Sequence, residues 1–277
     1  MLTDLHIHTT ISDGSESFEQ VLRQASQLGI GQLAFTNHDT LRGLSDAFEL
    51  GERFGIAVIG GVELSAWDSN AHTKVHVLGL GLASEYAPAI SELCEPLLER
   101  RRANARWQIE QLRRAGMAFD PGIIERLAAE STSIYSQHIM AALTRAPYTS
   151  RVYNELYRML FKGKGICARD ISYLDPVDAV RAIKESGALA ILAHPGRYQN
   201  FELVPTLVAA GLDGIEKYHP DHGPLEWYRA QLLADRFGLI CTGGSDYHGS
   251  FGESPGLGSY RLKRASRLLR PRAAVSP

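Results

Sequence analysis

Short apolar runs that contain or end near a histidine or a carboxylate recur along this chain of 277 residues. Segments with helical periodicity separate most of these runs, and such alternation of strand and helix builds a parallel sheet or a barrel. The sequence therefore predicts an α/β fold. The expected strands cover residues 2–6, 32–36, 57–63, 74–80, 188–193, 214–217 and 239–242. The expected helices between them cover residues 18–28, 44–54, 177–186 and 225–237.

The middle of the chain interrupts this alternation. Residues 84–164 show helical patterns and no strand-like run, including a long stretch over 87–115 that Pro96 should kink or divide. Shorter helices are expected over residues 123–130, 137–143 and 152–161. The sequence therefore predicts a helical insertion at 84–164 that caps the substrate site. The residues on either side of it in the sequence, 1–83 and 165–262, are expected to form the barrel, and a basic tail follows at 263–277.

Composition narrows the class of protein without indicating one activity. The formal net charge is −2, so the whole chain has no electrostatic pull toward nucleic acid or membranes. No apolar run approaches the ~18 residues that span a bilayer, and no signal peptide is visible. The three cysteines lie far apart and form no Cys-x-x-Cys pair, which fits the reducing cytoplasm. Two stretches are rich in basic residues, one over 100–114 and one in the tail, where we expect a solvated, partly disordered end.

Histidines and carboxylates lie at or near the ends of the expected strands. In an α/β barrel the carboxyl ends of the strands meet on one face, so these side chains should converge. Burying many polar groups without partners is costly, and metal ions bound by imidazole and carboxylate remove that cost. Each signal alone is weak, because a His-x-His pair or a lone core histidine often has a structural role. Their joint placement predicts a metal site built from His6, His8, Asp13, His38, Glu63, His76, His194, Asp246 and His248.

Motifs spread over nearly the whole chain carry a resemblance to a known family. They are Asp4-Leu5-His6-Ile7-His8-Thr9, Ser12-Asp13-Gly14, Thr36-Asn37-His38-Asp39, Gly61-Val62-Glu63, His76-Val77-Leu78-Gly79, Ala193-His194-Pro195-Gly196-Arg197 and Gly244-Ser245-Asp246-Tyr247-His248. Through them the chain resembles the PHP (polymerase and histidinol phosphatase) domain of the amidohydrolase-like superfamily. The resemblance implies a distorted (β/α)7 barrel with up to three metals, here with a helical insertion.

The resemblance also implies how the metal ligands divide. A first site would be held by His6, His8, Glu63 and Asp246. A second would be held by Glu63, His76 and His194, with Glu63 bridging, and a third by Asp13, His38 and His248. The expected cofactors are three divalent metal ions, with manganese preferred and zinc or iron as alternatives. Every expected ligand is present, which argues against a degenerate domain without metal.

The helical insertion makes the chain similar to the nucleotide phosphatases among PHP proteins. These remove the 3′-phosphate from nucleoside 3′,5′-bisphosphates, such as pAp to AMP, by a metal-activated hydroxide, which implies a phosphoric monoester hydrolase. One alternative is a 5′→3′ exoribonuclease acting on short or 5′-phosphorylated RNA. An alternative of another class is a non-catalytic metal-binding module. The expected partner is a nucleotide or short oligonucleotide, with no membrane and no obligate protein partner.

The same resemblance assigns roles around the substrate. The expected catalytic residues are His194, Arg197, Asp246 and His219, with His219 as a candidate proton donor. Asp39 is expected to orient a ligand histidine. An arginine on a helix can equally belong to a solvated face, and a helix histidine can equally serve packing alone. The expected substrate-binding residues are Asp13, His38, Arg101, Arg102, Asn104, Ser136, His138 and Arg197.

Overall fold

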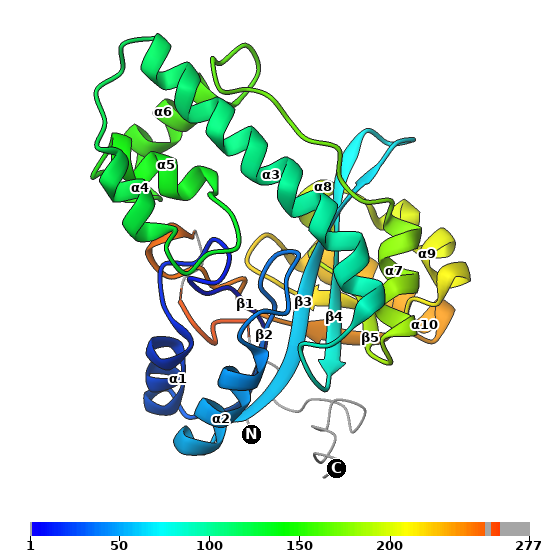
Figure 1. Cartoon of the computed structure of the whole chain (residues 1–277). Coiled ribbons are helices and arrows are strands. Elements are labelled where there is room, and N and C mark those ends of the chain that lie inside the picture. The colour runs from blue at the N-terminus through cyan, green and yellow to red at the C-terminus, as the bar shows by residue number, and fades with distance from the viewer. Residues whose placement is uncertain (1, 253–255, 261–277) are drawn as a thin grey trace.

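The computed structural model describes residues 2–252 and 256–260, in which seven strands form one sheet in chain order (Figure 1). After the last strand the chain returns to the first, where the backbone N–H of His8 donates to the carbonyl of Tyr247 at 2.8 Å. The sheet therefore curls on itself, and the distorted (β/α)7 barrel is confirmed. The strands are β1 (Leu2–Ile7), β2 (Ile30–Phe35), β3 (Ala57–Asp68), β4 (Thr73–Leu82), β5 (Leu189–Leu192), β6 (Gly214–Tyr218) and β7 (Ile240–Gly243).

One strand departs from the parallel arrangement. β4 is antiparallel to both β3 and β5, whereas the other neighbouring pairs are parallel. β3 ends at Asp68 and β4 begins at Thr73, and so short a connection can form a hairpin but not a parallel crossover. β3 also runs five residues past the Glu63 at which the sequence predicts its end, from 63 to 68. This hairpin places His76 of β4 opposite Ser65 of β3.

Amphipathic helices cover the outside of the sheet, while Leu5, Ala34, Ile59, Leu78, Leu80, Ile191 and Ala193 form a buried cluster from five strands. Helix α1 begins after Ser17, whose hydroxyl accepts the backbone N–H of Gln20. The covering helices are α1 (Phe18–Gln27), α2 (Leu44–Phe54), α7 (Pro176–Glu185), α9 (Val204–Ala210) and α10 (Pro224–Phe237). The sequence does not predict α9, the short helix α8 (Pro195–Tyr198), or the 3-10 turns η1 (Phe201–Leu203) and η2 (Gly249–Phe251).

The segment between β4 and α7 forms a helical unit with its own apolar core, beside the mouth of the barrel (Figure 1). Its helices are α3 (Pro88–Arg114), α4 (Pro121–Leu127), α5 (Ser136–Leu143) and α6 (Arg151–Phe161). Helix α3 joins the two cores, because Ile90 and Leu97 pack with the barrel whereas Leu112 packs with the insertion. It continues through Pro96, so the expected division there does not occur. α4 starts at Pro121, earlier than expected, because Asp120 caps it.

Along the part of the chain that the structure describes, no helix is both long and apolar enough to cross a membrane. The basic tail expected at 263–277 lies outside the described residues.

Candidate metal centre

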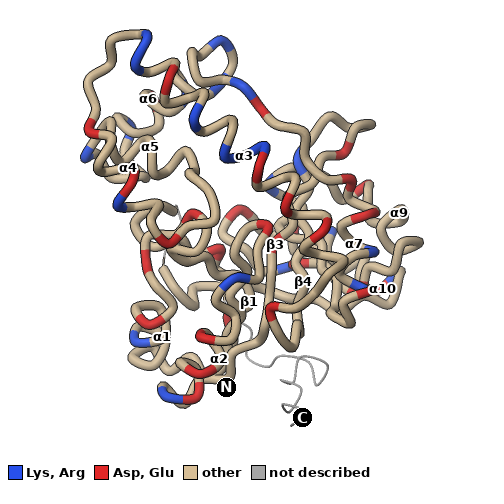
Figure 2. Tube along the Cα trace, viewed as in Figure 1, with Lys and Arg blue, Asp and Glu red and all other residues tan. Residues whose placement is uncertain are grey.

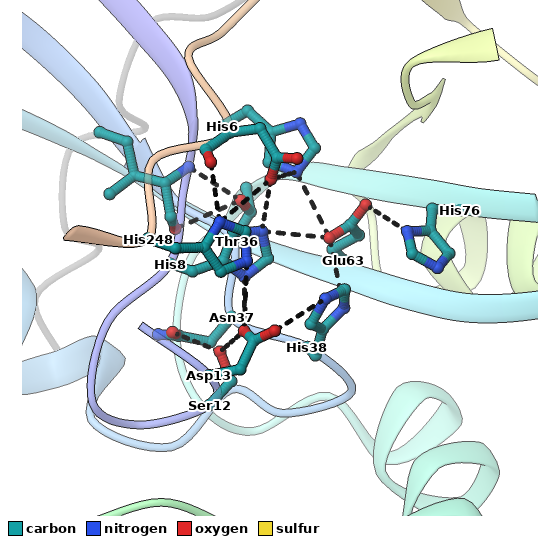
Figure 3. Close-up of polar contacts among 12 residues, drawn as sticks. His6, His8, Ser12, Asp13, Thr36, Asn37, His38, Glu63, His76 and His248 are labelled. Carbon is teal, nitrogen blue, oxygen red and sulfur yellow. Dashed lines mark hydrogen bonds and ion pairs between the residues drawn. The ribbon is translucent and has the colours of Figure 1, made fainter. Parts of the chain in front are cut away.

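The expected metal ligands converge at one end of the barrel. Figure 3 shows seven of them close together: His6, His8, Asp13, His38, Glu63, His76 and His248. His6 lies in β1 and His8 just beyond it, Glu63 in β3 and His76 in β4, while the others follow strands in loops. The strand order explains the convergence, because the ends of adjacent strands meet at the same rim. Close groups of ligand atoms are formed by His8, Asp13, His38 and His248, by His6, His8, Glu63 and Asp246, and by His38, Glu63 and His76.

Glu63 is the hub of this centre and is almost completely buried. Its Oε1 lies 2.8 Å from Nδ1 of His76 and 2.9 Å from Nε2 of His194. Its Oε2 lies within 3.1–3.3 Å of ring nitrogens of His6, His8 and His38. Each oxygen faces a different set of imidazoles, which is the arrangement that the predicted bridging role requires.

Asp13 and Asp246 lie on either side of His8. The Oδ1 of Asp246 is 3.3 Å from Nε2 of His8 and 3.4 Å from Nε2 of His6. The Oδ1 of Asp13 is 3.5 Å from Nδ1 of His8 and 3.4 Å from Nε2 of His248. His8 therefore faces ligands of two predicted sites, an arrangement that the sequence does not reveal.

The donor set suits divalent metal ions. Several buried ring nitrogens make no hydrogen bond, and leaving each one without a partner costs about 1–3 kcal/mol. Imidazole nitrogen with carboxylate oxygen is the ligand chemistry of manganese, zinc and iron sites. The nitrogens are Nε2 of His6, both nitrogens of His8, Nδ1 of His38 and Nδ1 of His194. The residues of the centre therefore offer the ligand atoms that a divalent metal ion requires.

The electrostatics of the centre keep its carboxylates ionised. Burial alone would raise the pKa of Glu63, but neighbouring imidazoles, first of all His76 and His6, outweigh burial and hold this pKa well below its usual value. Neighbouring imidazoles act in the same way on Asp13 and Asp246, whose pKa values also lie well below the usual range. The centre is therefore rich in negative charge.

The histidines divide into two groups. Burial lowers the pKa of His38 to about 4 and that of His194 to about 3, despite the nearby carboxylates. For His8, burial acts in the same direction, but the nearby carboxylates of Asp246 and Glu63, at 3.3 and 3.1 Å from Nε2, prevail and raise the pKa to about 9. His38 and His194 are consequently neutral at pH 7, which is the form that binds a metal ion.

Backbone strain marks the two loops that carry His194 and Asp246. Both residues have positive φ, at 26° and 50°, a region that residues other than glycine rarely adopt. Such strain gathers at functional sites and is held by the surrounding structure. Gly244 shows how tight the packing is, because a Cβ there would lie 2.3 Å from Cβ of His6.

Glu216 is a buried residue of this centre that sequence reasoning missed. Its carboxylate oxygens lie 3.2 and 3.3 Å from Nδ1 of His6, and one of them accepts the backbone N–H of His194 at 2.9 Å. The signal in the sequence is an acid inside a short apolar strand, directly after Gly214 and Ile215.

The structure corrects the role expected for Asp39. Its oxygens accept hydrogen bonds from the backbone and hydroxyl of Ser65 and from Nη2 of Arg101, at 2.6–2.9 Å, and not from a histidine. Ser65 lies opposite His76 in the β3–β4 hairpin, so the carboxylate of Asp39 stabilises the hairpin at the position of that histidine. The same contact joins the barrel to helix α3.

Two adjoining cavities open at the mouth of the barrel. The first has a volume of about 180 Å³ and is lined by the metal centre together with Arg197, His219 and tyrosines of the insertion. The second, of about 360 Å³, is lined by Arg101, Asn104 and other residues of the insertion and of β4. Ser136 and Tyr157 line both cavities.

The remaining candidates for substrate binding lie elsewhere. Arg102 lines neither cavity, because its guanidinium donates to the carbonyl of Thr132 and to Glu95. His138 is completely buried and its Nδ1 accepts the backbone N–H of Tyr135. The structure therefore brings Asp13, His38, Arg197 and Ser136 to the first cavity but not Arg102 or His138.

Comparison with known proteins identifies the family. Residues 4–168 match the model of the PHP domain. The chain belongs to the PHP domain family. Within this family it is similar to phosphoribosyl 1,2-cyclic phosphate 1,2-diphosphodiesterase of Eggerthella lenta, with 55% identity over 93% of this chain and 98% of the relative.

Two further PHP relatives act on nucleotides or RNA by their names. The 3′,5′-nucleoside bisphosphate phosphatase of Chromobacterium violaceum is 33% identical over 88% of this chain and 86% of its own length. The 5′-3′ exoribonuclease Rnm of Escherichia coli is 30% identical over 90% of this chain and 85% of its own length. Both classes are those that the insertion predicts from sequence.

A solved structure agrees with these relatives. A protein of Bifidobacterium adolescentis described as a metal-dependent phosphoesterase superposes with a TM-score of 0.84 and 26% identity, covering 93% of this chain and 91% of its own. Together with the ligand clusters, the comparisons show that this PHP protein is a metal-dependent phosphoesterase that works by hydrolysis.

Proposed function

We propose that this protein hydrolyses the cyclic phosphodiester of phosphoribosyl 1,2-cyclic phosphate. The observation that carries this choice is the 55% identity, over almost the full length of both chains, to the diesterase that is named for this compound. The size of the first cavity supports it, because about 180 Å³ lies below the roughly 300–1,000 Å³ of pockets for drug-sized ligands. A phosphorylated sugar suits such a space better than a polynucleotide.

A nucleoside 3′,5′-bisphosphate is the second candidate substrate, as the sequence predicts. It is favoured by the second cavity, whose larger volume adjoins the first and gives room for a base. The two candidates share a ribose that carries a phosphoester and a separate 5-phosphate. They differ in the bond cleaved, a diester in the first and a monoester in the second.

Arg197 is placed to bind the phosphate that reacts. Its Nη1 lies 3.0 Å from Oδ2 of Asp246, and the side chain is 41% exposed toward the first cavity. Burial would lower its pKa, but Tyr198, Asp246 and Asp221 raise it, so the guanidinium is always charged. It therefore stabilises negative charge on the non-bridging oxygens in the transition state.

His219 is placed to donate a hydrogen bond to the leaving oxygen. Its Nδ1 accepts the backbone N–H of Asp221 at 3.0 Å, so in the neutral ring the proton is on Nε2. This Nε2 lies 3.4 Å from Oδ2 of Asp246, at the wall of the first cavity. When a P–O bond to the sugar breaks, this N–H stabilises the negative charge that develops on the departing oxygen, which takes up its proton from solvent water.

Divalent ions held by the expected ligands supply two effects when bound: they neutralise phosphate oxygens and make a coordinated water more acidic. Glu63 and the neutral rings of His38 and His194 would be among the residues that hold these ions. The catalytic roles of Asp246 and His194 are those of ligands that also border the reacting phosphate.

The second cavity is placed to hold the 5-phosphate. Its lining includes Lys74, Arg101, Lys162 and Arg169 with Asp170 as the only acid, and cationic residues are visible along α3 and its surroundings (Figure 2). Burial lowers the pKa of Lys74 and the nearby Lys162 and Arg101 lower it further, while Asp170 opposes them. An anion in this cavity would relieve that repulsion.

The substrate is tested by a panel assayed with the manganese-loaded protein. We expect the highest kcat/KM for phosphoribosyl 1,2-cyclic phosphate, followed by a nucleoside 3′,5′-bisphosphate, with little turnover of a short 5′-phosphorylated RNA. A higher value for the bisphosphate makes the second candidate correct, and a higher value for the RNA makes the protein an exoribonuclease. ³¹P NMR of the products shows which bond is cleaved.

The 5-phosphate site is tested with paired lysine variants. Lys162→Ala should raise KM about tenfold for the 5-phosphorylated substrate, because one charge-assisted contact is lost. It should leave KM unchanged for ribose 1,2-cyclic phosphate, which lacks that group. Lys164→Ala is the control, since Lys164 is exposed and does not line the cavity. Equal effects of Lys162→Ala on both compounds would contradict the assignment.

A further inference from the structure

Glu216 is a buried carboxylate between two metal ligands that come from different strands. It lies in β6 with no exposed surface. Its two oxygens are 3.2 and 3.3 Å from Nδ1 of His6, which lies in β1. One oxygen also accepts the backbone N–H of His194, two residues after the end of β5, at 2.9 Å. One side chain thus contacts a strand and a loop of the centre.

The contact with His6 determines which ring nitrogen faces the metal centre. An ionised carboxylate only accepts hydrogen bonds, so Nδ1 of His6 must carry the proton. In the neutral ring, which is the form that binds a metal ion, the other nitrogen, Nε2, then has a free lone pair. This Nε2 lies 3.3 Å from Glu63 and 3.4 Å from Asp246, in the midst of the first ligand set. Glu216 therefore selects the tautomer that can bind a metal ion.

The contact with His194 acts on backbone conformation. His194 has φ 26° and ψ 56°, and a strained residue of this kind persists only where neighbouring groups hold it. The carboxylate holds its N–H, while Nε2 of the same residue faces Glu63 at 2.9 Å. Loss of the acceptor would free the turn and move the ring away from Glu63.

We propose that Glu216 is a positioning residue that presents His6 and His194 together to the metal centre, without being a ligand itself. Its oxygens are engaged by Nδ1 of His6 and the His194 backbone, on the side of the His6 ring away from Glu63. The inference depends on the metal centre and not on the substrate, so a different substrate leaves it intact.

Glu216→Gln in the full chain tests the role, with Asp213→Asn as the matched control. Asp213 also accepts a backbone N–H of β5, from Ala190 at 2.8 Å, but it pairs with Lys184 away from the ligands. A glutamine keeps the size of Glu216 and has one acceptor oxygen for two donors. Metal affinity is measured by calorimetric titration of the metal-free proteins with zinc and with manganese. Thermal unfolding without metal is measured alongside.

The expected result is a Kd raised about 10- to 100-fold by Glu216→Gln at unchanged stoichiometry, with no change in Asp213→Asn. In the zinc-loaded protein, the NMR signal of the His6 Nδ1–H should be present in the wild type and altered in the variant. Glu216→Asp, which keeps the charge but shortens the reach, should be intermediate, and it replaces Glu216→Gln if that variant does not fold.

Two results would overturn the proposal. A Kd and a His6 signal like those of the wild type, with unfolding lowered as in Asp213→Asn, would show that Glu216 only stabilises the fold. Loss of a whole metal equivalent, with a changed visible spectrum of the cobalt-substituted protein at saturation, would show that Glu216 is a ligand.

Discussion

His138 offers a sharp test of whether a residue of the insertion serves structure or substrate. Its ring is completely buried in α5, and its Nδ1 accepts the backbone N–H of Tyr135 at 3.2 Å. The proton of the neutral ring is therefore on Nε2, which is buried and makes no hydrogen bond. Protonation of Nδ1 would remove the acceptor, and burial lowers the pKa of His138 to about 4, against the weaker opposing effect of Asp13.

The direction in which stability changes with pH follows from comparing the pKa of His138 in the folded and unfolded chain. The folded pKa of about 4 lies below the ~6.5 of an unfolded histidine, so the unfolded chain binds more protons between these values. The stability that depends on a neutral His138 is present above pH 6.5 and is lost as the pH falls toward 4. With 1.36 kcal/mol for each pKa unit, the loss from pH 7.5 to pH 5 is about 2 kcal/mol.

The perturbation is His138→Asn, in which the amide oxygen can take the place of Nδ1. Urea unfolding of the metal-free proteins at pH 7.5, 6 and 5 measures the free energy of unfolding of both. The variant will be less stable at pH 7.5 because its side chain is smaller, and this deficit should shrink by about 2 kcal/mol at pH 5. The ligand histidines titrate in both proteins, so their effect cancels in the difference.

Two results would refute this reasoning. Parallel stability profiles would show that His138 does not titrate as its burial demands. A fall in kcat/KM of more than about 100-fold in a folded, metal-loaded variant would show that the ring acts on the substrate. We expect kcat/KM within about threefold of the wild type, because His138 lines neither cavity.

Three further outcomes follow from contacts in the centre. His194→Ala should lower the rate of phosphate release by at least about 10³-fold and weaken metal binding, and a retained rate in protein of verified metal content would contradict this. Arg197→Ala should lower kcat/KM by about 10²–10³-fold at unchanged metal content, since it removes one donor to the transition state; metal analysis with the release assay checks both. Arg101→Ala should cost about 3–5 kcal/mol in urea unfolding, because it leaves the Asp39 carboxylate buried and unpaired; a loss under 1 kcal/mol would show that solvent reaches it.

The convergence of the expected metal ligands could be predicted because residue type and position point in the same direction. His6, Glu63 and His194 each lie at or near the end of an apolar run, and a barrel brings such ends together whatever the details of packing. The antiparallel direction of β4 was not predicted, because the short connection after Asp68, which excludes a parallel crossover, became visible only when β3 proved to run past Glu63.

The contact of Glu216 with His6, and the choice of Arg101 among the arginines of α3, could not be predicted from local sequence patterns. A single acid in a strand does not reveal that it meets His6, a residue 210 positions away in the chain. Arg100, Arg101 and Arg102 are consecutive on a helix and therefore point about 100° apart, since 3.6 residues make a turn. Only Arg101 faces Asp39, whereas Arg100 reaches the carbonyl of Ser172. Choosing among them requires the direction in which α3 crosses the barrel.

The contacts of the insertion also bear on the kind of substrate that fits. Gln137 donates to Oδ2 of the predicted ligand Asp13 at 3.0 Å, and Ser131 donates to the carbonyl of Ser12 at 2.6 Å. Together with the ion pair between Arg101 and Asp39, these hydrogen bonds hold the insertion against barrel residues that are predicted metal ligands or lie next to them. Moving the insertion away from the barrel to admit a polynucleotide would break these contacts and disturb the metal centre. A compact substrate that fits beneath the insertion in its present position requires no such movement. We therefore favour a phosphorylated ribose over RNA.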